Sequence, residues 1–79
     1  MLLRVKSIEK LIFEGEVYGF SARAKDGEFV CLDKHADYLS VLDKGELYIL
    51  DDKLKRIQTI NLDRDFILLL ENNIAAVFC

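Results

Sequence analysis

The apolar residues of this chain come in short runs, alternating or continuous, and no stretch repeats them at helical spacing for three turns. Alternation with a period of two is typical of a strand with one buried face, whereas an amphipathic helix needs apolar residues three and four positions apart. Leu3 and Val5, for example, are each followed by a basic residue. The pattern predicts an all-β chain.

Several further runs predict strands separated by turns. Leu11 to Phe13 form the second run, and Gly15 is expected to mark a turn or bulge after it. From Val17 to Ala24, alternate side chains are expected to point to opposite sides of one strand. The expected faces are Tyr18, Phe20, Ala22 and Ala24 on one side and Val17, Gly19, Ser21 and Arg23 on the other.

Turn residues separate the strands predicted in the rest of the chain. We expect turns at residues 25–27 and hairpins at residues 51–53 and 72–73, because Asp and Asn bond locally and Gly and Asn enter the left-handed region. The continuous run Phe66–Leu70 predicts a strand covered on both faces. A short helix over residues 35–42 is an open alternative with weak capping.

Seven or more short strands with regularly spaced turns favour a sandwich or barrel. We expect a single domain over residues 1–79, a small sandwich of two packed sheets with about eight to ten strands.

Composition excludes several classes of function. The net charge is −3 with both signs interspersed, so the basic stripe that nucleic acid requires is missing. The longest apolar run, Phe66–Leu70, is far short of the roughly 20 residues that span a bilayer, and no signal peptide is visible. We expect a soluble chain that associates with membranes only through other proteins and is monomeric in isolation.

Candidate catalytic groups are few. Cys31 and Cys79 are expected to be free thiols, Cys31 buried as a small apolar residue and Cys79 exposed at the terminus. Cys31 and His35 are candidates for a nucleophile and base, but the sequence shows neither an orienting partner nor oxyanion donors for them. A loop histidine that packs or hydrogen-bonds is the favoured interpretation.

Metal and nucleotide sites are not indicated either. Asp51 with Asp52, and Asp63 with Asp65, are interpreted as charged turns, because a magnesium or calcium site needs several more oxygens at fixed geometry. No phosphate-binding glycine loop or dinucleotide fingerprint is present. We therefore predict no cofactor, no metal and no catalytic residue, which leaves a binding surface.

The segment from Asp26 to Leu39 resembles the signature of the epsilon subunit of F-type ATP synthases, in which a D-G-E-F segment leads through G-I-x-P-G into H-A-P-L-L. The matching positions are Asp26, Gly27, Glu28, Phe29, His35, Ala36 and Leu39. Phe13 to Val17 looks like the family's F-x-G-x-V and Leu42 to Leu47 like its L-x-P-G-x-L, all at gapless spacing. The chain departs from the family's glycines and prolines at Val30, Asp33, Lys34, Asp37 and Arg64-Asp65, which predicts altered loop shapes.

The resemblance covers Leu2 to Val77 and implies the family's N-terminal β-sandwich. The helical hairpin that follows in the family has no counterpart in these 79 residues, so its inhibitory role and ATP site are not expected here. The resemblance further implies a c-ring-facing turn at Asp26, Gly27 and Glu28, and gamma-facing residues at Ser7, His35 and Ala36. Two alternatives stay open: Glu28 as a solvated turn acid, and His35 bonded to its own backbone.

The function implied is a non-catalytic rotor part that binds gamma and the c ring and couples proton translocation to ATP synthesis. Its expected place is peripheral, on the cytoplasmic face of the membrane, with a bacterial source. A stand-alone protein-binding adaptor is the alternative, and an enzyme would require a pocket that holds Cys31 and His35 together.

Overall fold

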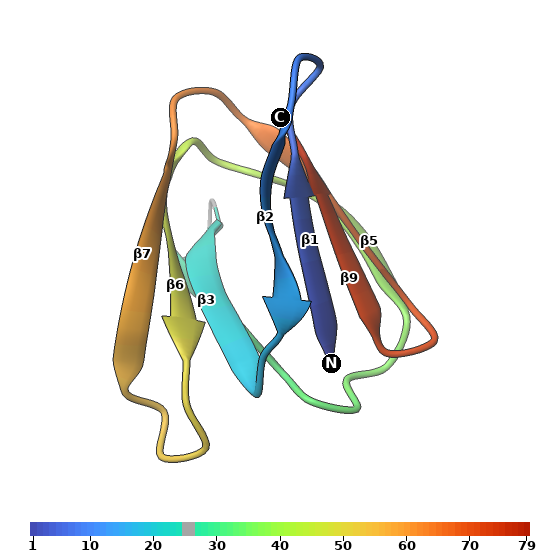
Figure 1. Ribbon diagram of the computed structural model, residues 1–79, viewed down its shortest axis with the longest axis vertical. Coiled ribbons are helices and arrows are strands. Elements are labelled where there is room, and N and C mark those ends of the chain that lie inside the picture. The colour runs from blue at the N-terminus through green and yellow to red at the C-terminus, as the bar shows by residue number, and fades with distance from the viewer. Residues whose placement is uncertain (25–26) are drawn as a thin grey trace.

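The computed structural model describes residues 1–24 and 27–79, which form nine strands and no helix (Figure 1). In chain order the strands are β1 (Leu2–Lys6), β2 (Leu11–Glu16), β3 (Gly19–Ala24), β4 (Gly27–Leu32), β5 (Tyr38–Leu42), β6 (Gly45–Leu50), β7 (Arg56–Leu62), β8 (Phe66–Glu71) and β9 (Ile74–Phe78). The predicted all-β class is confirmed. Accordingly, these described residues include no helix long and apolar enough to cross a bilayer.

The strands make two sheets, as predicted. One has five strands in the order β2-β1-β9-β8-β5 and the other has four in the order β4-β3-β6-β7. The first and last strands, β1 and β9, run parallel in the middle of the larger sheet, with Leu2 opposite Ile74 and Lys6 opposite Phe78. The other described pairs are antiparallel. The two ends of the chain therefore lie at opposite ends of the sandwich (Figure 1).

The core lies between the sheets, because each strand turns alternate side chains inward. Both sheets contribute the largest fully buried side chains: Leu3, Val5, Leu42, Leu68, Leu70 and Val77 from the larger sheet, and Phe20, Cys31 and Leu47 from the smaller. Full burial of one such aliphatic side chain contributes about 1.5–3 kcal/mol. The predicted burial of Cys31 is confirmed.

Both predicted hairpins are present. At the β6–β7 turn, Asp51 Oδ1 accepts hydrogen bonds from the backbone amides of Lys53 at 2.8 Å and Lys55 at 2.9 Å. At the β8–β9 turn, Asn72 and Asn73 have φ values of 52° and 60°. Two consecutive left-handed residues define the type I′ turn, which matches the twist of the strands it joins.

Two local predictions are wrong. Gly15 lies inside β2 opposite Leu3, and the irregularity in this strand pair falls between Val5 and Lys6 instead. Residues 35–37 are irregular and residues 38–42 form β5, so no helix forms over 35–42. The reason is tertiary: β5 pairs residue by residue with β8, and this pairing outweighs a weak local helix preference.

The faces predicted for residues 17–24 are correct only in part. Phe20 and Ala22 point into the core as expected, but the strand begins at Gly19 and Val17 packs against the core from the connection before it. The amide of Val17 donates to the Met1 carbonyl at 2.8 Å, which holds this connection beside the amino terminus. The side chain of Ala24 and the predicted turn at residues 25–26 lie outside the described residues.

The prediction that Phe66–Leu70 is covered on both faces is also wrong. Burial alternates along β8, and Ile67 and Leu69 are 46% and 37% exposed. A two-layer sandwich covers only the inner face of each sheet, so these side chains point outward from the larger sheet.

Candidate functional site

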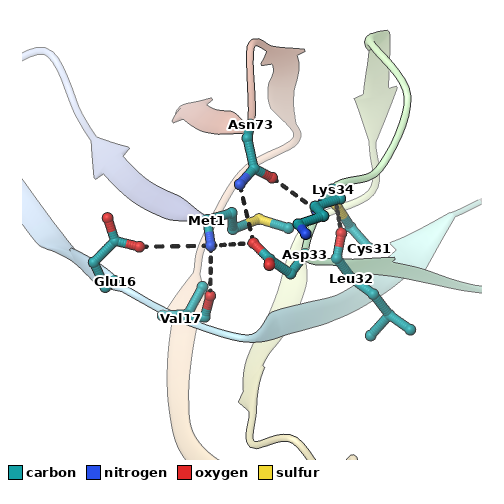
Figure 2. Close-up of polar contacts among 8 residues, drawn as sticks. All are labelled: Met1, Glu16, Val17, Cys31, Leu32, Asp33, Lys34 and Asn73. Atoms are coloured by element: carbon teal, nitrogen blue, oxygen red, sulfur yellow. Dashed lines mark hydrogen bonds and ion pairs between the residues drawn. The ribbon is translucent and has the colours of Figure 1, made fainter.

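The amino terminus binds two neighbouring segments at one end of the sandwich (Figure 2). The Met1 ammonium donates to Asp33 Oδ1 at 2.5 Å and to the Val17 carbonyl oxygen at 2.9 Å, and lies 3.5 Å from the Glu16 carboxylate. Its side chain is buried in the core. These contacts tie the start of β1 to the β2–β3 connection and to the loop after β4.

Asn73 extends this network to the β8–β9 turn. Its side-chain Nδ2 donates to Asp33 Oδ1 at 3.0 Å, and its Oδ1 accepts from the Lys34 amide at 2.8 Å (Figure 2). Lys34 has a φ of 65°, a left-handed conformation that glycine adopts without steric cost. Lys34 is one of the positions at which the chain departs from the family's glycines.

The network shifts two ionisable groups, the Met1 amino group and the Asp33 carboxyl, toward the charged form. Burial lowers the pKa of the Met1 amino group, but the hydrogen bond and charge of Asp33, together with Glu16, outweigh it and raise the pKa above its ordinary value. The hydrogen bonds from Met1 and then from Asn73 lower the pKa of Asp33. Both groups are therefore charged at neutral pH.

An aromatic cluster bridges the two sheets beside this loop. Phe29 of β4 stacks on Tyr38 of β5 with ring centroids 5.2 Å apart, and His35 lies about equally far from both, at 6.1 and 6.2 Å. His35 Nδ1 is 2.6 Å from the Ala36 carbonyl oxygen, so the tautomer protonated at Nδ1 donates there. The backbone bond expected as one alternative for His35 is thus present, and Ala36 is exposed.

The structure does not bring the predicted gamma-facing residues together. Ser7 follows the last residue of β1, where its Oγ donates to the Lys10 carbonyl and accepts from the Lys10 amide, both at 3.3 Å. His35 and Ala36 lie near the first residue of β1, because Asp33 is bonded to Met1. The five residues of β1, with a rise of about 3.4 Å per residue, separate the two loops (Figure 1).

The predicted c-ring-facing turn is described in part. Asp26 lies outside the described residues, Gly27 has a φ of 125° and Glu28 is exposed on β4. Glu28 Oε2 forms an ion pair with Arg56 Nη2 at 3.5 Å. The Arg56 guanidinium also lies over the ring of Tyr48, 3.8 Å from its centroid, which is a cation–π geometry. Sequence alone gave no signal for this pair.

The outer face of the larger sheet is divided into two halves. Its apolar half, here called the apolar strip, comprises Leu39, Val41, Ile67, Leu69, Ile74 and Phe78. Leu39 and Val41 are each 67% exposed, and they lie opposite Leu69 and Ile67. Contiguous apolar surface of this kind marks an interaction site more often than a free surface.

The other half of this face carries charged side chains beside the apolar Leu2 and Leu11. On β1 and β2, Arg4 Nε donates to Glu14 Oε1 at 2.9 Å, and both side chains are partly exposed. The apolar strip therefore borders the basic residues Arg4 and Lys6 of β1 along part of its length, as the core of a protein interface borders a polar rim.

The candidate chemical groups are engaged in structural roles. Burial raises the pKa of the Cys31 thiol to about 11, although the amino terminus opposes this shift, so at neutral pH Cys31 is a poor nucleophile. Asp51 and Asp65 accept hydrogen bonds from backbone amides, which agrees with their interpretation as turn residues. Within residues 1–24 and 27–79, no group of three or more His, Cys, Asp or Glu side chains is placed to hold a metal ion.

Together the fold and its surfaces define a small β-sandwich with an exposed acidic residue, Glu28, near one end and an apolar strip on one outer face. The chain belongs to the family described as the beta-sandwich domain of the ATP synthase delta/epsilon chain, which matches residues 1–73. The resemblance seen in the sequence is thereby confirmed. No curated protein sequence matches the chain significantly.

Solved structures share the fold. A chain in the central stalk and c-ring structure of the Tetrahymena thermophila mitochondrial ATP synthase has a TM-score of 0.73 and 17% identity, over 98% of this chain and 60% of that one. A chain in the OSCP/F1/c-ring structure of the Euglena gracilis mitochondrial ATP synthase has a TM-score of 0.76 and 16% identity, over 96% of this chain and 48% of that one. This chain thus spans 60% and 48% of the length of these two. Both are mitochondrial, so the expected bacterial source is not supported.

Proposed function

We propose that this chain is a non-catalytic central-stalk subunit of an F-type ATP synthase, which couples proton translocation to ATP synthesis by binding both gamma and the c ring. Residues 1–79 act as one domain, peripheral to the membrane. Family membership and the similarity to central-stalk structures support this proposal.

The apolar strip is the observation that carries the proposal. We assign it to gamma, because the centre of a stable interface is apolar and depleted of charge. The loops that hold Ser7 and His35 lie at the two ends of this sheet. A partner that lies along the strands can therefore contact both loops, although they are far apart.

Gly27 and Glu28, at the start of β4, are assigned to the c ring. Glu28 is exposed and Gly27 leads into it at the start of β4, whereas the residue just after β4, Asp33, is bonded to Met1, so Glu28 lies at the end of the sandwich opposite the Met1 network. A charge pair with a basic residue in a c-ring loop would steer docking more than it would tighten the complex.

The test is complex formation with gamma from the same organism, measured by size-exclusion chromatography and calorimetry. Val41→Lys in the apolar strip is expected to weaken binding at least tenfold, because it places a charge in the interface. Ile57→Lys is the matched control, since Ile57 is 63% exposed but lies on the smaller sheet. Equal loss in both variants, or no complex with the unaltered chain, would contradict the proposal.

A stand-alone adaptor is the second candidate, because the same strip would serve another protein partner. The two candidates differ in the identity of that partner. Failure to bind gamma, together with a strip-dependent complex with a different protein, would favour the adaptor.

A further inference from the structure

Glu28 already has a partner within the chain. It lies on β4 and Arg56 on β7, which are the two edge strands of the smaller sheet, with β3 and β6 between them. Their side chains reach over the outer face of the sheet to form the 3.5 Å ion pair. The side chains of Arg56 and Glu28 are 56% and 55% exposed, so a docking protein can reach both.

A β-bulge places Arg56 on this face. Ile49 pairs with Gln58 and Leu50 pairs with Arg56, so Ile57 is the extra residue in β7. Side chains alternate along a strand, and one inserted residue turns those beyond it to the opposite face. Arg56 consequently lies on the same side as Tyr48, and the Tyr48 ring holds its guanidinium.

We propose that Arg56 competes within the chain for Glu28. A basic side chain of the docking partner must displace Arg56 before it can pair with Glu28. This inference rests on the proposed docking of Glu28 against the c ring. Tyr48 makes the exchange possible, because Arg56 keeps its aromatic contact when Glu28 turns to the partner. Arg56 thereby slows docking and selects for partners whose basic group is placed to replace it.

The expected size of the effect is modest. Ion pairs between exposed side chains are weak and screened by salt, so removing the competitor is expected to speed docking about two- to fivefold. The difference should shrink as ionic strength rises.

The experiment compares Arg56→Gln with Lys55→Gln, which removes the same charge from the neighbouring exposed residue in the β6–β7 turn. Association rates of the full chain with the detergent-solubilised c ring of its own organism are measured at low and physiological salt, with gamma present. Arg56→Gln is expected to associate about two- to fivefold faster than Lys55→Gln. In a Glu28→Gln background the two should associate at equal rates.

The outcomes separate this inference from the proposed function. If the unaltered chain binds the c ring and the two variants associate equally, or Arg56→Gln is slower, the competitor role is wrong and the docking role stands. If the unaltered chain does not bind the c ring, the docking of Glu28 is wrong and this inference falls with it.

Discussion

Asn73 and Asp33 are 40 positions apart in sequence, and the 3.0 Å hydrogen bond from Asn73 Nδ2 reaches the same carboxylate oxygen that accepts from the Met1 ammonium. One oxygen atom thus connects the amino terminus, the loop after β4 and the β8–β9 turn (Figure 2). Asp33 stands where the family usually has a proline, and in this chain its carboxylate makes contacts that a proline side chain cannot offer.

Asp33→Asn is expected to destabilise the chain in a pH-dependent way. The Met1 amino group has a raised pKa, so its contribution is present below about pH 8 and is lost as pH rises through the folded-state value. Asp33 has a lowered pKa, so its contribution is present above about pH 4 and is lost as pH falls.

Thermal unfolding of Asp33→Asn and the unaltered chain from pH 3 to pH 10 tests this expectation. The difference in melting temperature between the two proteins should be largest between about pH 4 and about pH 8, and it should become smaller outside that range. Asp52→Asn, in an exposed turn, serves as control and should show no such window. A difference that is constant with pH would contradict the assignment.

Leu68→Ala should cost about 2–5 kcal/mol of unfolding free energy, because Leu68 is fully buried in the core. Leu69→Ala, one position along β8, removes a partly exposed side chain and should cost less than about 1 kcal/mol. Urea denaturation of both variants measures the contrast, and equal losses would mean that β8 is covered on both faces.

Lys34→Gly is expected to stabilise the chain by about 0.5–1 kcal/mol. A non-glycine residue in the left-handed region costs roughly 1–2 kcal/mol, which exceeds the entropy that glycine loses on folding. Lys44→Gly, at a position without positive φ, should destabilise by up to about 1 kcal/mol. Chemical denaturation distinguishes the two, and destabilisation by both would rule out strain at Lys34.

Gly19→Ala should destabilise the chain by about 1–3 kcal/mol, because a Cβ atom there would lie 2.6 Å from the Cys31 carbonyl oxygen. At Gly15 the nearest atom would be a ring carbon of Phe13 at 3.4 Å, and φ is not positive. Gly15→Ala should therefore be neutral or stabilising by a few tenths of a kcal/mol. A large loss of stability in Gly15→Ala would instead support the turn first predicted at Gly15.

Local signals in the sequence predicted most of the strands. The paired asparagines at 72 and 73, the bonding of Asp51 to its own turn and the apolar neighbours of Cys31 all act within a few residues, so the sequence specifies them directly. Gly15 was misassigned because glycine occurs both in turns and inside strands, and the sequence does not distinguish the two cases. At Gly15 there is room even for a Cβ atom, so no close backbone contact requires a glycine there.

Which residues meet on each surface depends on the strand order, so it could not be predicted from local sequence signals. Five consecutive apolar residues in β8 indicate two apolar faces, but not whether this chain or another protein covers the outer one. The Glu28–Arg56 pair requires both the order of the smaller sheet and the bulge at Ile57. Ser7 and His35 are separated by the length of β1, which the spacing of a sequence signature does not reveal.

The parallel pairing of β1 with β9 sets the order in which the chain can be assembled. All four strands of the smaller sheet have been synthesised by Leu62, whereas β1 must wait for Ile74 to Phe78 before its place in the larger sheet is complete. Contacts between residues so distant in sequence form late and slowly, because the long intervening loop must first be closed. A nascent chain on the ribosome thus carries an unfinished larger sheet until β9 emerges, and its apolar surface is open to chaperones for that time.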